Sequence, residues 1–426
     1  MEVADRVGSS RSANGLGPQA FLACHRCDWR GDLLNLYACP ACGASLLVTY
    51  PETQELPQAA AAEGMWRYRR HLPVSADVEP TTLGEGGTPL IGAPRLDPSG
   101  GLFLKNETTN PTASFKDRPV AVAATMAREL DLSGLICAST GNTGVAVAAY
   151  AARAGLPAAC VVPEATPSAK LLQIEAVGAH IVRVSGDYSD AHALTRSAAE
   201  NFGWANLTST YVNPYMLEGD KTVAYEIFEQ LGEGFPDWVL VPVGAGPLLA
   251  AIYKGFLELG ATGAATPRMV AVQAAGCAPI VRAFEKGARE VREWEHPVET
   301  AASSIADPLR GYPEDGTRTL SAVRQSGGMA VAVSEQWMFG AMVDLASSEG
   351  LFVEPGAAVA VAAYRGLADR KVMGAGERAV IVLTGHGLKD PDALSSASGE
   401  QAEASIVEPG DVGALGEVLE ARLCER

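Results

Sequence analysis

Short apolar runs alternate with longer helical patterns between about residues 80 and 390. The apolar runs are rich in Val and Ile, and most of them end in Gly or Pro, as strands do before a turn. They predict strands at Leu135–Ala138, Ala159–Val162, Ile181–Val184, Val239–Val243, Val270–Val272 and Val380–Leu383. Helical spacing predicts helices at Val120–Leu130, Gly144–Ala154, Ser189–Asn201, Val223–Leu231, Leu248–Leu259 and, beyond a Ser/Glu-rich stretch, Val412–Leu423. Strands that alternate with helices indicate an α/β protein with parallel sheets covered on both faces.

Length and charge limit the number of domains, the partners and the cellular location that can be expected. The 426 residues suffice for two or three domains. A net charge of −17 argues against a nucleic-acid partner and against an anionic membrane surface, because both attract clustered Lys and Arg. No apolar run approaches the ~20 residues of a membrane-spanning helix. The first 20 residues lack the apolar core of a signal peptide, so we expect a cytoplasmic location.

Four cysteines form two pairs near the start of the chain. Cys24-x-x-Cys27 and Cys39-x-x-Cys42 are separated by eleven residues. Each pair can place two thiolates on one turn, and four soft ligands without a spare position are typical of a structural Zn²⁺ site. Four unligated thiols, or a redox pair, are the alternatives. His25 lies between two ligands and is expected to be a surface residue.

A lysine opens the first predicted helix, in the stretch Asn110-Pro-Thr-Ala-Ser-Phe-Lys116-Asp-Arg-Pro119. Ser114 could cap this helix, and Asp117 would place a negative charge in its first turn, where it is favoured. A lysine at the start of a helix is most often a solvated charge. The loops that follow the other strands give this lysine more weight.

Two strands end in loops that suit small anions, and a third ends in a loop rich in polar residues. The first runs into Ser139-Thr-Gly-Asn-Thr-Gly144, which offers backbone N–H groups, two kinds of hydroxyl-bearing side chain and an amide before a helix. The second runs into Gly244-Ala-Gly-Pro247 and another helix, a pattern that fits a phosphate but is weak in isolation. The third ends in Thr384-Gly-His-Gly-Leu-Lys-Asp390.

Taken in this order, the lysine segment and these loops resemble the threonine synthase branch of the fold-type-II pyridoxal-phosphate enzymes. Asn213-Pro-x-x-Leu-Glu-Gly-x-Lys-Thr222 and Phe352-Val-Glu-Pro355 add to the similarity, which covers roughly residues 80–390. The resemblance implies a tryptophan synthase β-like fold of two three-layer α/β domains with an N-terminal zinc-ribbon-like extension. It also implies a homodimer that acts on a small amino-acid substrate.

The resemblance divides the chain into segments. It implies a disordered N-terminus, a zinc-ribbon-like module, a large cofactor-binding domain in two pieces, a small domain, and a linker with a C-terminal helix. These comprise, in that order, residues 1–20, 21–50, 51–117 with 214–390, 118–213, and 391–426.

The resemblance also assigns roles to single residues. Lys116 would carry the cofactor and move the Cα proton, which requires an uncharged amine and hence a lowered pKa. Asn142 would bind the ring hydroxyl of the cofactor, and Thr384 would face its pyridine nitrogen. The cofactor phosphate would be held by Gly244, Ala245, Gly246, Pro247 and Leu248. The substrate carboxylate would be held by Ser139, Thr140, Gly141 and Thr143. Roles for Glu354 and His386 stay open, since each could be only a residue at a strand end or turn.

Two segments depart from the family pattern and keep the substrate open. Asp187 stands where many threonine synthases carry an amide, and the residues that follow near the family's basic position are His192 and Ala193. Met216 replaces a second basic residue. If these positions contact a substrate phosphate, they bind an anionic leaving group less favourably than basic residues would.

Four functions are therefore compatible with these motifs. The first is conversion of O-phospho-L-homoserine to L-threonine. The second is a cysteate synthase-like β-replacement on O-phosphoserine or another activated amino acid, and the third is β-elimination. The fourth is a binding protein built on a retired enzyme fold, against which the intact Lys116 and Asn142 argue.

Overall fold

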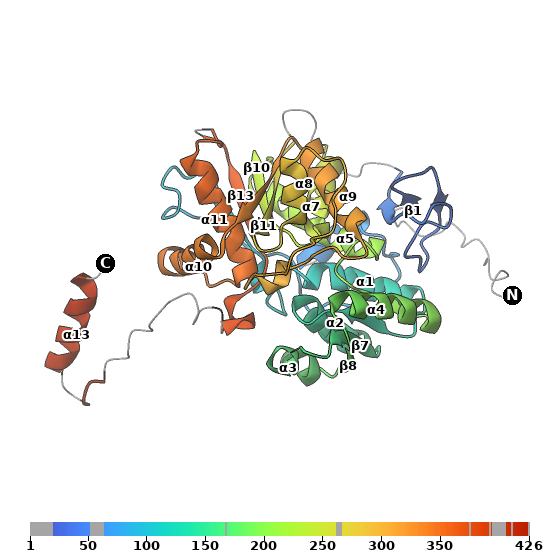
Figure 1. Cartoon of the computed structure of the whole chain (residues 1–426), viewed down its shortest axis with the longest axis horizontal. Coiled ribbons are helices and arrows are strands. Elements are labelled where there is room, and N and C mark those ends of the chain that lie inside the picture. The colour runs from blue at the N-terminus through green and yellow to red at the C-terminus, as the bar shows by residue number, and fades with distance from the viewer. Residues whose placement is uncertain are drawn as a thin grey trace.

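Three sheets organise the chain (Figure 1). The structure is a computed structural model and describes residues 20–51, 64–166, 168–260, 266–374, 376–391, 393, 406–409 and 412–424. The disorder predicted for residues 1–20 falls, apart from residue 20, outside this described part, as does most of the predicted linker after Pro391.

The six-stranded sheet is parallel except at one edge. Its strand order is β12 (Met329–Val333), β11 (Arg268–Ala274), β10 (Trp238–Pro242), β13 (Ala379–Leu383), β5 (Leu102–Asn106) and β4 (Leu90–Gly92). The edge strand β4 pairs antiparallel with β5. The strands β10 and β13 are buried along their whole length, which explains why their sequences are continuous apolar runs.

Helices cover both faces of this sheet. Val239 and Val241 of β10 pack into one apolar cluster with Leu248. The intervening Leu240 packs into another with Ala358. Because successive strand residues point to opposite faces, the sheet is the middle layer of three. The helices of the first face are α7 (Pro247–Glu258), α8 (Pro279–Glu285) and α9 (Pro313–Gln325), and those of the second are α10 (Glu335–Glu349) and α11 (Pro355–Asp369).

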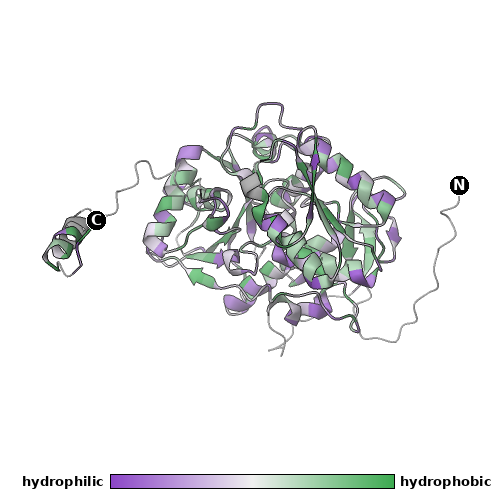
Figure 2. Cartoon of the chain, turned by 90° about the horizontal axis from the view of Figure 1, so that it is seen from below, coloured by the Kyte–Doolittle hydropathy of each residue, from purple (hydrophilic) through white to green (hydrophobic). Residues whose placement is uncertain are grey.

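The four-stranded sheet is parallel and repeats the same layering. Its order is β8 (His180–Val184), β7 (Ala158–Pro163), β6 (Leu135–Ala138) and β9 (Ala205–Asn206). Cys137 and Cys160 face the cluster formed with α1 and α2, whereas Ile136 and Val161 face α4. The helices are α1 (Asp117–Glu129), α2 (Asn142–Ala154), α3 (Ser168–Ala176) and α4 (Tyr188–Phe202). Figure 2 shows hydrophobic residues on the strands and more polar residues on the peripheral helices.

The third sheet belongs to the cysteine-rich module, and it is antiparallel. It consists of β1 (Phe21–Cys24), β2 (Arg30–Gly31) and β3 (Leu46–Thr49). Its Leu22 and Val48 pack into the same apolar cluster as α1 and α2. The remaining elements are η1 (Gly64–His71), η2 (Glu107–Thr109), α5 (Pro214–Asp220), α6 (Thr222–Gln230), η4 (Ser303–Ile305), η5 (Gly387–Lys389) and α13 (Val412–Cys424). Figure 1 shows α13 apart from the body of the molecule.

The α/β class and every strand and helix predicted from periodicity are confirmed, with bounds that shift by a few residues. Elements without a clear pattern were missed, among them β4, β5, β12, α9, α10 and α11. We propose domain boundaries near residues 117 and 213, because the chain passes from one parallel sheet to the other at these points.

A buried ionic network joins the two parallel sheets. The Arg118 guanidinium in the first turn of α1 donates to Glu107 (Nε–Oε2 2.7 Å) and to Glu226 (Nη1–Oε1 2.7 Å). Lys105 of β5 donates to the second oxygen of Glu226 at 2.7 Å. The side chains of all four residues are fully buried. Charges removed from water in this way must be paired, so the network fixes how α1 meets β5 and α6.

Replacing Arg118 with methionine should therefore be strongly destabilising. The change leaves two buried carboxylates without their main partner, and we expect a loss of about 3–5 kcal/mol in the free energy of unfolding. The matched control is Arg196→Met, which removes an exposed i,i+4 pair with Glu200 and should cost less than about 0.5 kcal/mol. Urea unfolding of both variants tests this; equal, small effects would contradict a structural role for the network.

Candidate active site and metal site

Lys116 lies immediately before α1, at the N-cap position. Its amine donates to the Ser209 hydroxyl and lies 4.1 Å from the centroid of the Phe115 ring. Burial lowers the pKa of Lys116 to about 8, although the charges of Asp220 and Glu354 act in the opposite direction. Burial therefore favours the uncharged amine, which is the form that a nucleophilic or proton-transferring lysine requires.

Asp220 is the acidic partner of this lysine, and the sequence analysis did not identify it. It is the last residue of α5, and burial raises the pKa of its carboxyl to about 8 against the opposing charges of Lys116 and Arg118. Its Oδ1 is buried without a hydrogen-bond partner among the described residues. Because Lys116 and Asp220 interact strongly, they titrate as a pair. The only sequence signal was its place within the Asn213–Thr222 motif.

Glu354, one of the two residues whose role the sequence leaves open, contacts the predicted site residue Asn142. The Asn142 amide donates to both of its carboxylate oxygens at 3.0 Å. Burial raises the pKa of Glu354. At Gly385 a Cβ atom would lie 2.5 Å from Glu354 Oε1, so only glycine fits beside this carboxylate.

His386 has a local role in the turn. Its Nδ1 accepts from the Leu388 N–H at 3.1 Å and so caps η5.

The lysine segment is held against the end of β13. Phe115 N–H donates to the Thr384 carbonyl at 3.0 Å, and His386 N–H donates to the Ala113 carbonyl at 3.0 Å. Ser114 pairs with Gly385 in an isolated bridge. The expectation that Ser114 caps α1 is wrong, because this pairing draws Ser114 away from the helix and no side chain caps α1. Its hydroxyl is buried without a partner in the part of the chain that the structure describes.

The glycine loop after β10 presents the beginning of α7. Gly246 has a φ of +94°, and a Cβ there would lie 2.4 Å from Thr319. The carbonyls of Ala245 and Gly246 accept from the Thr319 and Tyr211 hydroxyls at 2.6 and 3.3 Å. The carbonyls of this loop are thus occupied. The N–H groups of Gly244, Ala245 and Gly246 lie at the N-terminus of α7, where N–H groups favour a bound anion.

The second anion loop follows β6 at the carboxyl edge of the four-stranded sheet. Ser139 and Thr140 are half-buried, Gly141 is exposed, and Asn142 and Thr143 are buried in the first turn of α2. Asn142 therefore joins this loop to Glu354, which precedes α11 of the other sheet. Together the three loops place a lysine of lowered pKa, a glycine turn and two buried unpartnered oxygens in one region. This donor set fits pyridoxal phosphate.

The residues that depart from the family pattern have structural partners here. Asp187 caps α4 in a capping box, and its Oδ2 lies 3.4 Å from Arg310. His192 stacks on Tyr312 at 4.6 Å between ring centroids, and burial lowers its pKa to about 4, so the ring is neutral. Met216 is buried in the core. None of these three side chains offers a positive charge to a phosphate.

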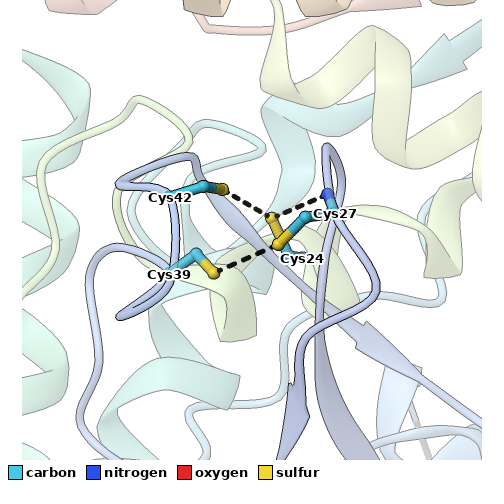
Figure 3. Close-up of side chains that lie close together, drawn as sticks. All are labelled: Cys24, Cys27, Cys39 and Cys42. Carbon is cyan, nitrogen blue, oxygen red and sulfur yellow. Dashed lines mark hydrogen bonds between the residues drawn. The ribbon is translucent and has the colours of Figure 1, made fainter.

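The four paired cysteines converge on one point (Figure 3). Their Sγ atoms all lie within 4.8 Å of one another. Cys24 and Cys42 are 3.5 Å apart, and Cys27 and Cys39 are 3.7 Å apart, measured between sulfurs. A tetrahedral centre with Zn–S bonds of about 2.3 Å has sulfur–sulfur edges of about 3.8 Å, so the arrangement fits a four-thiolate metal site.

The turns around this cluster are tight, and backbone N–H groups point at a cysteine sulfur. The N–H groups of Arg26 and Cys27 donate to Cys24 Sγ at 3.3 and 3.4 Å, and Gly43 has a φ of +74°. His25 is exposed, as expected, and its Nδ1 lies 3.0 Å from the Ser45 carbonyl.

Comparisons with known proteins identify the family. The family model described as pyridoxal-phosphate dependent enzyme matches residues 81–385. The chain therefore belongs to the pyridoxal-phosphate-dependent enzyme family. The threonine synthase of Methanocaldococcus jannaschii is 40% identical over 378 residues, which cover 86% of this chain and 91% of that protein. The threonine synthase of Methanosarcina acetivorans is also 40% identical, over 84% of this chain and 89% of that protein.

Solved structures support the fold. Threonine deaminase isoform 2 from Solanum lycopersicum aligns with a TM-score of 0.63 at 23% identity, covering 82% of this chain and 98% of that one. The fungal L-serine ammonia-lyase from Rhizomucor miehei aligns with a TM-score of 0.63 at 22% identity, over 73% and 97% of the two chains. The expected fold-type-II architecture and the resemblance to threonine synthases are thus confirmed. Among the described helices, none has the length and apolar character needed to cross a bilayer.

The metal site predicts a specific dependence on cysteine. Purified protein should contain about one zinc ion per chain, and Cys39→Ser should lose it because three thiolates hold the ion less tightly. Cys277→Ser, which alters a buried thiol outside the cluster, should keep it. Metal analysis by mass spectrometry measures both variants. Wild-type protein free of zinc, or retention of zinc in Cys39→Ser, would refute the assignment.

The acidic partner predicts a shift in the titration of the lysine. Asp220→Asn removes the carboxylate whose charge favours the protonated amine, so the pKa of Lys116 should fall below about 8. The rate of Lys116 acetylation against pH, followed by peptide mass spectrometry on cofactor-free protein, gives this pKa. The exposed Asp369→Asn serves as control. An unchanged midpoint in Asp220→Asn would rule out the coupling.

Proposed function

We propose that this enzyme is threonine synthase-like and converts O-phospho-L-homoserine and water to L-threonine and inorganic phosphate. The observation that carries the proposal is Lys116, whose pKa is lowered by burial and whose charge interacts with that of Asp220, in a chain 40% identical to threonine synthases over most of its length. Bound pyridoxal phosphate supplies an electron sink for the charge left at the substrate Cα.

Each residue of the site has a defined task under this proposal. The Lys116 amine takes the Cα proton, and Asp220 stabilises the ammonium that results. Ser139, Thr140, Gly141 and Thr143 bind the substrate carboxylate. The loop Gly244–Leu248 binds the cofactor phosphate with one N–H fewer than usual, because Pro247 has none. Asn142 binds the ring hydroxyl of the cofactor, and its amide is held in place by Glu354.

Thr384 would set the protonation of the cofactor's pyridine nitrogen. A hydroxyl opposite the pyridine nitrogen leaves the ring less protonated than a carboxylate does. The weaker electron sink favours elimination and replacement over transamination. We further propose that the chain acts in the cytoplasm as a homodimer and holds structural Zn²⁺ at Cys24, Cys27, Cys39 and Cys42.

A second function is favoured by the environment of the leaving group. His192 is neutral, Met216 is buried, and Asp187 is paired with Arg310. A substrate whose departing group needs little positive charge fits these residues better. The corresponding reaction is β-replacement by an external nucleophile on an activated amino acid whose leaving group carries less negative charge than phosphate; O-phosphoserine is the phosphate-releasing substrate of the same reaction class.

The deciding assay uses cofactor-loaded protein and O-phospho-L-homoserine, with phosphate and threonine measured together. Equal amounts of both products support the proposal. Lys116→Ala should then be at least ~10³-fold slower, whereas Lys371→Ala, which changes an exposed lysine, should be unaffected. Neither product from protein with bound cofactor would contradict threonine synthesis. A product formed instead from O-phosphoserine and a nucleophile would establish the second function.

A further inference from the structure

A cavity of about 710 Å³ lies between the cysteine-rich module and the large sheet's helices, away from the Lys116 loops. Its walls come from β3 of the module, from α5, and from the neighbouring helices α7 and α9. This volume is within the range of sites that bind small organic molecules. Nothing in the proposed reaction uses this space.

The walls of this cavity are unusually basic for so acidic a protein. The chain as a whole carries a net charge of −17, yet five cationic and two acidic side chains line the cavity. The cations are Arg26, Arg70, Lys221, Lys254 and Arg318, and the acids are Glu258 and Glu314. With Glu218, which pairs with Lys221 and Lys254 from behind the wall, three carboxylates stand against five cations. The remaining excess of positive charge in a partly enclosed space attracts anions from solution.

Several of these cations are held in place. The Lys221 side chain is fully buried, and its amine lies 2.6 Å from Glu218 and 2.8 Å from Glu258. Lys254 contacts the same two carboxylates, at 2.9 and 2.5 Å. These contacts orient both ammonium groups before any ligand arrives.

Arg318 is positioned by different partners. Its guanidinium lies 4.2 Å from the centroid of the Tyr211 ring and donates to Ser45 Oγ at 3.0 Å. Burial lowers the pKa of Arg318, which shows that its charge is poorly solvated. A bound anion would relieve this desolvation.

Much of the remaining wall is apolar. Leu47 and Val48 of β3 line the cavity together with Leu217, Ala250 and Leu257. A purely ionic ligand would leave these surfaces wet, whereas a ligand with an apolar body would cover them. The combination of apolar walls and oriented cations is typical of sites for amphipathic small molecules.

We propose that this cavity is a second binding site, which takes a small organic anion with an apolar body. It lies beside the α5–α6 junction, where Lys221 follows Asp220 in the chain. The site is therefore distinct from that of the amino-acid substrate but shares one structural element with it.

The test uses 8-anilinonaphthalene-1-sulfonate, a fluorescent anion with an apolar body, on the full-length, cofactor-loaded protein. We expect saturable binding that weakens about tenfold in Arg318→Gln, since a charge-assisted contact is lost. Arg324→Gln is the matched control, because Arg324 is exposed on the same helix and does not line the cavity. Arg70→Gln, at an exposed position, repeats the test without disturbing the core.

The neutral analogue N-phenyl-1-naphthylamine separates charge from apolar contact. It should bind at least about tenfold more weakly than the sulfonate. The proposal is overturned if binding does not saturate, if Arg324→Gln weakens it as much as Arg318→Gln and Arg70→Gln do, or if the neutral analogue binds equally well. None of these readouts depends on the catalytic activity.

Discussion

The pairing of Arg118 with two buried carboxylates is the constraint on which the arrangement of the site depends. Arg118 lies two residues after Lys116, in the first turn of the helix that the lysine opens. Its partners Glu107 and Glu226 come from segments that flank the large sheet. Because none of these charges can remain unpaired in the interior, α1 has one position relative to β5 and α6. The lysine is thereby placed before any cofactor binds.

The junction between α5 and α6 extends this constraint to the rest of the molecule. Asp220 interacts with Lys116, whereas the adjacent Lys221 contacts Glu218 and Glu258. The cysteine-rich module packs on the same segment, since Tyr50 donates to Glu218 at 2.6 Å and Tyr215 donates to the Leu34 carbonyl at 2.9 Å. A module whose four thiols converge on one point thus supports the segment that carries the acidic partner of the lysine.

The sequence sufficed for features that are local in the chain and failed for those that depend on distant contacts. Continuous apolar runs such as β10 follow directly from burial on both faces. The cysteine pairs follow from ligand spacing. The Asn142–Glu354 contact joins residues 212 positions apart, and the Lys116–Asp220 pair likewise needs the folded chain. Ser114 had the chemistry of a helix cap, but its pairing with Gly385 overrode that local preference.

We propose that Lys116 carries the cofactor, and reductive trapping tests this role most directly. Protein loaded with pyridoxal phosphate is treated with sodium borohydride, digested, and mapped by mass spectrometry. We expect a single phosphopyridoxyl group on the peptide that contains Lys116, and none in Lys116→Ala treated in the same way. A group on another lysine, with Lys116 unmodified, would contradict it.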